Sequence, residues 1–412
     1  MTENVPVGSP DALRFELADR LRADGVVSSP RVDEAMRAVP RHVFVPAVPL
    51  QQAYADDVVQ TKHDSAGTAI SAASQPRIVA MMLEQLGVQP GQRVLEIGAG
   101  TGYNAALLAH LVGDDGQVTT IDVDDDIVAG ARTALAAAGY PSVRVVLGDG
   151  AFGYPDGVPY DRVIATVGTT TDLPPAWLEQ LATDGRLVVP ARIRGSVTRS
   201  ITFEHAGDCW RSRDSEMCGF MPLRGTAAYP RRAVALTPDG DVTLEVHPEQ
   251  TVDQQALTGT LEWPRDEQWT GAHLGPNESA EWVWLWLACA LPNTLSRMPL
   301  QPSAIERGVV RPMFGWGTMA TTDGGALAYL TLRDTVPDDA ATAGRRCEIG
   351  VIGQGPGGAD LAGRVAEEIR HWDRDYRTRS PRFAIQPVGA GNPITGQFVF
   401  DLRLTRLAVD WD

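Results

Sequence analysis

The sequence is poor in several features that would point to particular protein classes. Its 412 residues include only four cysteines, and none of these stands at a spacing to another Cys or to a His that is typical of a zinc site. We therefore expect neither a disulfide framework nor a bound metal, and the few thiols fit a reducing, cytoplasmic compartment. The N-terminus also lacks a basic segment followed by an apolar run, so no signal peptide is expected.

Positive charge and long apolar runs are scarce as well. Lys and Arg number 36 against 52 Asp and Glu, which gives a formal net charge of −16. Because binding to a nucleic-acid backbone depends on Lys and Arg displacing counterions, no nucleic-acid partner is expected. The most apolar stretch, residues 282–291, is about half as long as the roughly 20 residues that a membrane-spanning helix needs. We expect it to be a core helix, and we expect no membrane partner.

The chain is long enough for two domains. Between residues 93 and 193, short apolar runs alternate with helical segments, beginning with "RVLEIG" and ending with "GRLVVPARI". This alternation indicates right-handed βαβ units. For residues 1–230 we predict an α/β fold with a doubly wound, mostly parallel sheet, preceded by two short helices between residues 11 and 39. Residues 231–412 lose the alternation, and we predict an additional C-terminal α+β domain there, with a strand at 346–353 followed by a helix.

A glycine-rich turn follows the first strand of this pattern. The stretch "VLEIGAGTGYN" places Gly98, Gly100 and Gly102 after a strand and before a helix, which is the context of a dinucleotide or nucleoside site. Tyr103 stands where a GxGxxG fingerprint has its third glycine, so a pyrophosphate ligand is disfavoured. Hydride transfer with a nicotinamide cofactor stays open as an alternative, as does a plain tight turn between strand and helix.

Acidic residues near the ends of three successive strands indicate the ligand. Glu96 repels phosphate and attracts a cation, which suits S-adenosylmethionine, a molecule with a sulfonium, an ammonium and no phosphate. Asp122 can accept both ribose hydroxyls, or alternatively cap a helix, and Asp149 can accept the adenine amino group. We predict an S-adenosylmethionine site. Its expected residues are Glu96, Gly98, Ala99, Gly100, Thr101, Gly102, Tyr103, Asp122, Val123, Asp149 and Gly150.

Further motifs show a resemblance to a known family. The stretches "AMRAVPRHVFVP", "AYAD", "SQPRIVAMMLEQL", "LPPAWLEQLATDGRLVVP" and "FMPLRG" occur in this order around the glycine turn. Together they resemble the protein-L-isoaspartate O-methyltransferases over roughly residues 11–225. The resemblance implies a class I S-adenosylmethionine-dependent methyltransferase with a Rossmann-like fold, which methylates a side-chain carboxyl of a peptide or protein. It also implies that Ser74, the serine before Gln-Pro, lies at the active site.

The chemistry of carboxyl methylation agrees with this implication. An aspartyl carboxylate, with a pKa of about 3.9, is already a nucleophile at neutral pH and needs alignment rather than a general base. Ser74 offers a hydroxyl donor, and the helix expected after Gln75 offers free backbone N–H groups for an anion, although Ser74 could instead only cap that helix. The expected substrate contacts are Asp56, Gln75, Arg77 and Val167, with Lys62 and His63 as further candidates.

Two departures from the family concern the acceptor side. The stretch "ISAASQP", which suits neither a strand nor a helix interior, carries Ala72 and Ala73 as an insertion between "IS" and "QP". The region 231–412 is absent from a minimal repair enzyme. Both features resemble the subgroup associated with ribosomally made, modified peptides, in which an aspartate of a constrained peptide is methylated and the ester collapses to an aspartimide.

We therefore expect a macrocyclic ribosomal peptide as substrate and a peptide-holding role for the C-terminal domain. Repair of L-isoaspartyl residues in damaged proteins is the first alternative. A scaffold that binds S-adenosylmethionine without catalysis is the second. The C-terminal domain could instead serve stability or dimerisation, and the oligomeric state is left open.

Overall fold

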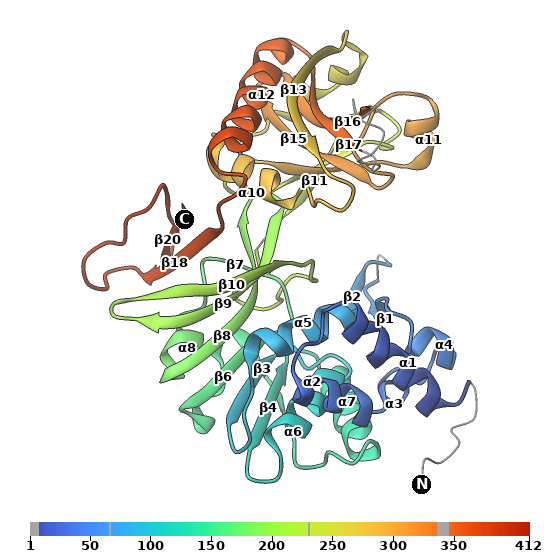
Figure 1. Ribbon diagram of the computed structural model, residues 1–412, viewed down its shortest axis with the longest axis vertical. Coiled ribbons are helices and arrows are strands. Elements are labelled where there is room, and N and C mark those ends of the chain that lie inside the picture. Colours follow the sequence, from blue (N-terminus) through green and yellow to red (C-terminus); the bar gives the residue numbers. More distant parts are fainter. Residues whose placement is uncertain (1–7, 66, 230, 336–345) are drawn as a thin grey trace, which may run out of the picture.

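The computed structural model describes residues 8–65, 67–229, 231–335 and 346–412. Figure 1 shows two lobes: a lower lobe that begins with the N-terminal helices, and an upper lobe that carries a second sheet and a long helix. The chain passes from the lower lobe to the upper lobe and back, so that the C-terminus lies beside the lower lobe (Figure 1).

Short helices at the N-terminus cover one side of the lower lobe. Helices α1 (Pro10–Ala23) and α2 (Pro30–Ala38) confirm the two helices predicted there. Each starts with a proline, and the serine before it, Ser9 or Ser29, accepts a hydrogen bond from a backbone N–H of the first turn. Two single-turn helices follow, α3 (Arg41–Phe44) and α4 (Leu50–Ala53).

The centre of the lower lobe is a parallel sheet with helices between its strands. Its strands are β3 (Arg93–Ile97), β4 (Gln117–Asp122), β5 (Arg144–Leu147), β6 (Tyr160–Ala165) and β8 (Leu181–Arg194), with the short β7 (Thr169–Thr170) beside β8. The order β8-β6-β3-β4-β5 confirms the doubly wound α/β fold. The helices that connect these strands or precede them are α5 (Pro76–Leu86), α6 (Tyr103–Val112), α7 (Asp125–Ala137) and α8 (Pro175–Glu179). Strand order reverses at β3, which is where such folds bind ligands.

The same sheet continues with antiparallel strands. Strand β8 pairs with β9 (Val197–Ala206), which pairs with β10 (Cys209–Met217). Beyond β10 come β18 (Pro381–Pro387), β20 (Thr405–Trp411) and β19 (Phe398–Asp401), from the C-terminal end of the chain. The division into residues 1–230 and 231–412 stays a prediction, but the pairing places the last strands in the sheet of the first lobe.

The upper lobe is built on a five-stranded antiparallel sheet. Its order is β13 (Asp266–Leu274), β17 (Arg346–Gln354), β16 (Ala326–Thr335), β15 (Gly317–Asp323) and β14 (Ser296–Pro299). Helix α12 (Gly358–Asp375) packs on this sheet and α10 (Glu281–Ala290) packs on α12. Smaller elements complete the lobe: β11 (Arg232–Ala235), β12 (Thr243–Val246), α9 (Gln254–Leu257) and α11 (Pro302–Glu306). Strand β17, α12 and the buried α10 confirm the strand, the following helix and the core helix predicted here.

One hydrophobic core runs through both lobes. Trp177 of the parallel-sheet region is in the same buried cluster as Trp286 of α10 and Trp372 of α12. The tip of the β8–β9 hairpin also inserts into the upper lobe, where the Gly195 N–H donates to Glu249 at 2.9 Å. The two lobes are therefore joined by a shared core and by the hairpin tip. Among the helices of the described ranges, none has the length and apolar character needed to cross a bilayer.

Candidate active site

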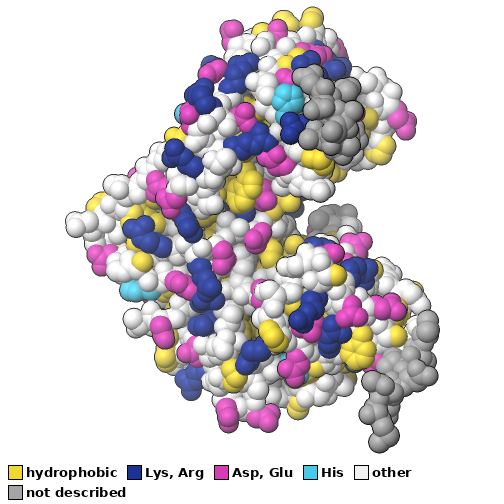
Figure 2. Space-filling view, in the orientation of Figure 1, with side chains coloured by type: hydrophobic (Ala, Val, Ile, Leu, Met, Phe, Trp, Pro, Cys, Tyr) yellow, Lys and Arg dark blue, Asp and Glu magenta, His cyan; other side chains and the backbone are white. Residues whose placement is uncertain are grey.

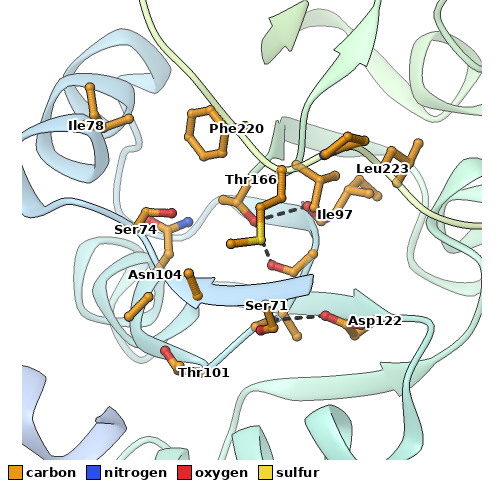
Figure 3. A pocket seen from close by; sticks show the side chains of 18 of the residues that line it. Ser71, Ser74, Ile78, Ile97, Thr101, Asn104, Asp122, Thr166, Phe220 and Leu223 are labelled. Carbon is orange, nitrogen blue, oxygen red and sulfur yellow. Dashed lines mark hydrogen bonds between the residues drawn. The ribbon is translucent and has the colours of Figure 1, made fainter. Parts of the chain in front are cut away.

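A cavity of about 700 Å³ lies at the carboxyl end of β3. Its walls come from the glycine turn after β3, from β2 (Ala69–Ala73), which pairs with β1 (Val59–His63), from the start of α5, and from the segment 217–224. Figure 3 shows Ser74, Thr166 and Phe220 around this space. The volume is that of an ordinary small-molecule site.

The glycine turn brings backbone close to the cavity. Gly98 has a φ of +100°, and a Cβ at this position would lie 2.8 Å from the Val167 side chain. Gly100 has a φ of +49° and faces the backbone carbonyl of Ala72 in β2. Both positions therefore require glycine, and the turn can approach a ligand without side chains in the way.

Asp122 is held at the edge of the cavity by backbone donors. Its carboxylate accepts hydrogen bonds from the N–H of Gly100 at 3.1 Å and of Asp124 at 3.3 Å. The guanidinium of Arg224 lies 3.7 Å from the same carboxylate and donates to Asp124 at 2.8 Å. Asp122 and Ser71 both line the cavity (Figure 3). This placement fits a carboxylate that accepts the hydroxyls of a ribose.

Glu96 lines the same cavity although it is fully buried. Its carboxylate accepts hydrogen bonds from Asn104 at 2.7 Å and Thr120 at 2.6 Å. Burial raises the pKa of Glu96 to about 7, against the opposing effect of these two donors. A cation entering the cavity would stabilise the charged form, so this carboxylate fits a positively charged ligand.

Asp149 has other partners. Its carboxylate accepts hydrogen bonds from the N–H of Ala151 at 3.0 Å and of Thr226 at 2.8 Å, and Asp149 is not among the residues that line the cavity. Its neighbour Gly150 does line the cavity.

Most of the predicted residues come together at this cavity. The predicted residues that line it are Ser74, Gln75, Glu96, Gly98, Ala99, Gly100, Thr101, Tyr103, Asp122, Val123, Gly150 and Val167. Gly102, Asp149, Asp56 and Arg77 do not line it. A Cβ at Gly102 would lie 3.2 Å from Leu135 of α7, so that glycine allows two helices to pack. Within the described ranges, no group of three or more His, Cys, Asp or Glu side chains could hold a metal ion.

The start of α5 differs from the prediction. Its first residue, Pro76, has no N–H; the N–H of Arg77 donates to Asp56 at 2.9 Å, and the N–H of Ile78 donates to the Gln75 carbonyl at 3.0 Å. The prediction that this turn offers free backbone donors to a substrate carboxylate is therefore wrong. Its first residue is a proline without an N–H, and the next two N–H groups already donate to acceptors within the protein. Gln75, not Ser74, is the N-cap, and its own side chain makes no capping hydrogen bond.

Asp56 and Arg77 instead hold this helix in place. The Arg77 guanidinium donates to Asp56 at 3.0 Å and also pairs with Asp24 of the loop after α1. The Gln75 side chain donates to the Asp56 carbonyl at 2.9 Å. These contacts satisfy Arg77 within the protein.

The stretch "ISAASQP" also differs from the prediction, because most of it is a strand. Strand β2 pairs antiparallel with β1, and the Ser71 hydroxyl accepts a hydrogen bond from Thr61 at 3.2 Å. Lys62 of β1 binds Asp124 at 2.9 Å and Asp126 at 2.7 Å, which ties the hairpin to the start of α7. Ala72 and Ala73, which the sequence predicts to be an insertion, are thus part of a strand, and the Ala72 carbonyl faces Gly100 of the glycine turn.

Several lining residues were missed by sequence reasoning. The "FMPLRG" stretch contributes Phe220, Met221, Leu223 and Arg224. This motif supports the family resemblance, but the sequence predicts no role in the site for its residues. Arg231 and Arg297 line the cavity from the C-terminal region. Nothing in the local sequence around either arginine marks it, because only the tertiary fold brings these segments to β3.

Comparison with known proteins identifies the family of this chain. The family model described as protein-L-isoaspartate(D-aspartate) O-methyltransferase (PCMT) matches residues 13–228, which is just over half of the chain. A protein-L-isoaspartate O-methyltransferase of Methanopyrus kandleri is 39% identical over 227 residues, covering 52% of this chain and 93% of the relative. Another, from Methanoregula boonei, is 41% identical over 212 residues, covering 52% and 93%. A solved protein-L-isoaspartate O-methyltransferase structure matches 90% of this chain and 96% of its own at 22% identity, with a TM-score of 0.49.

The matched region contains the glycine turn, Glu96, Asp122 and Ser74 around one cavity. A cleft with tightly packed glycines and two carboxylates fits a cationic nucleoside. The chain therefore belongs to the protein-L-isoaspartate(D-aspartate) O-methyltransferase family, and it is an S-adenosylmethionine-dependent carboxyl O-methyltransferase.

Proposed function

We propose that the methyl acceptor is the side-chain carboxylate of an aspartate in a modified, macrocyclic ribosomal peptide, and that the ester then collapses to an aspartimide. The observation that carries this proposal is the composition of the cavity wall. Ser74, in the region shared with the family, and Arg297, in the region beyond it, line the same cavity. Because the C-terminal lobe contributes to the wall of the cavity, the acceptor site suits a substrate that is larger than a flexible peptide end.

The transfer step needs alignment rather than a base. A carboxylate oxygen of the acceptor attacks the methyl carbon, the carbon–sulfur bond breaks, and its electron pair stays on sulfur, which becomes a neutral thioether. In our proposal the Ser74 hydroxyl donates to the other carboxylate oxygen and orients it. Asp122, held by the Gly100 N–H, would accept the ribose hydroxyls of bound S-adenosylmethionine, the buried Glu96 would offset its positive charge, and the glycine turn would allow close backbone approach. Apolar side chains that line the cavity, such as Phe220 and Ile78, would exclude water from it.

The second step requires no further group from the protein. The backbone nitrogen after the methylated aspartate attacks the ester carbonyl, loses its proton, and expels methoxide, which takes up a proton as methanol. The product has lost one water relative to the unmodified peptide. A constrained peptide favours this closure because its ring already holds the nitrogen near the ester.

Repair of L-isoaspartyl residues is the second candidate. The names of the relatives from Methanopyrus kandleri and Methanoregula boonei favour it. It would use the same cofactor site and the same transfer step. It offers no reason for an added lobe at the cavity.

Mass spectrometry separates the two candidates. The full chain is incubated with S-adenosylmethionine and either a linear isoaspartyl peptide or a macrocyclic peptide with one Asp-Gly step. Our proposal predicts gain of a methyl group and then net loss of water on the macrocycle only. Methylation of the linear isoaspartyl peptide alone would contradict it and support repair.

A further inference from the structure

Two arginines of the C-terminal region reach the cavity without an acidic partner. Arg231 precedes β11 and Arg297 lies in β14, and both side chains are exposed at the cavity wall. Within the described ranges, no ion pair or side-chain hydrogen bond involves either guanidinium. In a chain with an excess of 16 acidic charges, two unpaired guanidiniums at one cavity are available to a ligand.

Two contacts restrict the conformation of Arg297. Its backbone N–H donates to the Ser196 hydroxyl at 2.9 Å, which ties β14 to the tip of the β8–β9 hairpin. Its guanidinium stacks on the ring of Trp316 at 4.8 Å. A guanidinium that lies over an aromatic ring can still donate to the two oxygens of a carboxylate. Little side-chain freedom remains to be lost when such a ligand binds.

Trp316, which contacts Arg297, belongs to a cluster of aromatic side chains. Trp316 stacks on Phe314 with ring centroids 5.8 Å apart, and Trp284 meets both rings edge to face. Trp316 is 39% exposed, and Met217, which lines the cavity, is 49% exposed. Figure 2 shows the surface hollowed between the upper lobe and the part of the lower lobe that carries the β1–β2 hairpin. Exposed apolar side chains therefore lie beside Arg297, in Trp316, and at the cavity itself, in Met217.

We propose that Arg231, Arg297 and Trp316 form a specificity site for an acidic acceptor peptide: the arginines bind a second carboxylate of the substrate beside the one that is methylated, and the aromatic ring packs against its apolar part. The inference rests on the proposed function for the identity of the ligand as a peptide. Charge complementarity supports it, because a guanidinium fork can donate two parallel hydrogen bonds to a carboxylate. The overall negative charge of the chain would otherwise repel an acidic peptide, so selective binding requires a local positive site.

The test uses two macrocyclic peptides with one Asp-Gly step each, flanked by two Glu residues in one and by two Gln residues in the other. Binding of the fluorescein-labelled peptides to the full chain, saturated with S-adenosylhomocysteine, is measured by anisotropy. We expect the Glu peptide to bind roughly tenfold more tightly than the Gln peptide, as charge-assisted hydrogen bonds allow. The preference should shrink as salt is raised, because both guanidiniums are exposed.

Variants assign the preference to the site. Arg297→Gln should reduce the preference for the Glu peptide to about threefold or less, and Arg297→Lys should restore part of it. Arg364→Gln is the matched control, because Arg364 is an exposed arginine of the same lobe, outside the cavity, that pairs with Asp323 at 2.6 Å. The control removes the same charge and should leave the preference unchanged.

The outcomes separate this inference from the proposed function. Equal binding of the two peptides to the unaltered chain, or a preference that Arg297→Gln leaves unchanged, would overturn the specificity site. Loss of the preference in Arg364→Gln to the same extent would overturn it too, because the effect would then be one of net charge. Binding is read without turnover, so a chain that prefers the Glu peptide but does not methylate it contradicts only the proposed function.

Discussion

The guanidinium of Arg41 donates to the backbone carbonyl of Ser74 at 3.0 Å. Arg41 is fully buried, it also donates to the Ala53 carbonyl at 2.9 Å, and it stacks on the ring of Tyr103 at 5.0 Å. Burial lowers the pKa of Arg41, an effect that its ring and acidic neighbours oppose. One side chain thus connects the helical N-terminal segment, the residue proposed to orient the acceptor, and the helix after the glycine turn.

Replacing Arg41 should disturb both stability and the acceptor side. Arg41→Leu leaves the carbonyls of Ala53 and Ser74 buried without a donor, so we expect a loss of about 2–4 kcal/mol in the free energy of unfolding. Denaturant unfolding measures this loss. Under conditions where the variant stays folded, kcat should fall, whereas the Kd of S-adenosylmethionine should change little. An unaltered kcat would show that the Ser74 carbonyl contact has no part in positioning the acceptor.

Removing the Ser74 hydroxyl should slow transfer. A hydrogen bond to a charged group contributes about 1.5–3 kcal/mol, so Ser74→Ala should reduce kcat/KM for the peptide by roughly tenfold to a hundredfold. Cofactor affinity, measured by calorimetry, should stay the same. Ser28→Ala is the comparison, because Ser28 is exposed, lies outside the cavity, and its hydroxyl donates to Glu84 at 3.1 Å. A full rate in Ser74→Ala would remove the role that we assign to this residue.

Asp122 should govern cofactor affinity. Its carboxylate is oriented by two backbone N–H groups, so Asp122→Asn loses charge-assisted bonds to the ribose hydroxyls and should weaken S-adenosylmethionine binding roughly tenfold or more. Calorimetry with S-adenosylhomocysteine gives the same comparison without turnover. Asp125→Asn, at an exposed neighbour in the first turn of α7, is the control. Equal Kd values for Asp122→Asn and the control would place the ribose elsewhere.

Glu96 should make stability depend on pH. Its pKa is about 7 in the folded chain, above the ordinary value of 4.5, because burial disfavours the charge. This group therefore costs nothing below pH 4.5, and its desolvation destabilises the fold increasingly as the pH rises to about 7. Glu96→Gln removes the cost, so the variant should gain stability relative to the unaltered chain over this interval, by up to about 3 kcal/mol. A stability difference that is constant between these pH values would contradict the raised pKa.

The C-terminal strands should be needed by the first lobe. Strand β18 pairs with β10, and the Thr405 hydroxyl donates to the Thr171 carbonyl at 2.7 Å. Deleting residues 378–412 exposes the edge of β10 and part of the shared core, so we expect aggregation or a clear loss in Tm. Size-exclusion chromatography and thermal unfolding measure this. A monodisperse, active deletion variant would show that these strands belong functionally to a dispensable domain.

Patterns over short stretches of sequence predicted those parts of the fold that form between segments close together in the chain. The alternation around β3 to β8 gave the doubly wound sheet, and the turn at Gly98 and Gly100 gave the position of the site. The pairing of β18 with β10 joins segments that are about 170 residues apart, as Trp210 opposite Ile385 illustrates, and no local periodicity encodes such a pair.

The acceptor side was harder to predict for two physical reasons. The sequence predicts an anion site at the first turn of α5. It does not reveal that the Asp56 carboxylate accepts a hydrogen bond from the Arg77 N–H. The strand "AISAA" lacked the usual strand residues, since it is stabilised by its partner β1 rather than by its own propensity. Arg297 reaches the cavity only through the docking of the second lobe.

The most direct test of the account is methyl transfer itself. The full chain is incubated with methyl-deuterated S-adenosylmethionine and the macrocyclic Asp-Gly peptide, and the product is analysed by mass spectrometry before and after mild alkali. We predict a deuterated methyl group on the aspartate side chain that alkali removes, followed by a species that has lost one water, both diminished in Ser74→Ala. A label that withstands alkali, or bound cofactor with no transfer to any aspartyl or isoaspartyl peptide, would contradict a carboxyl methyltransferase site at this cavity.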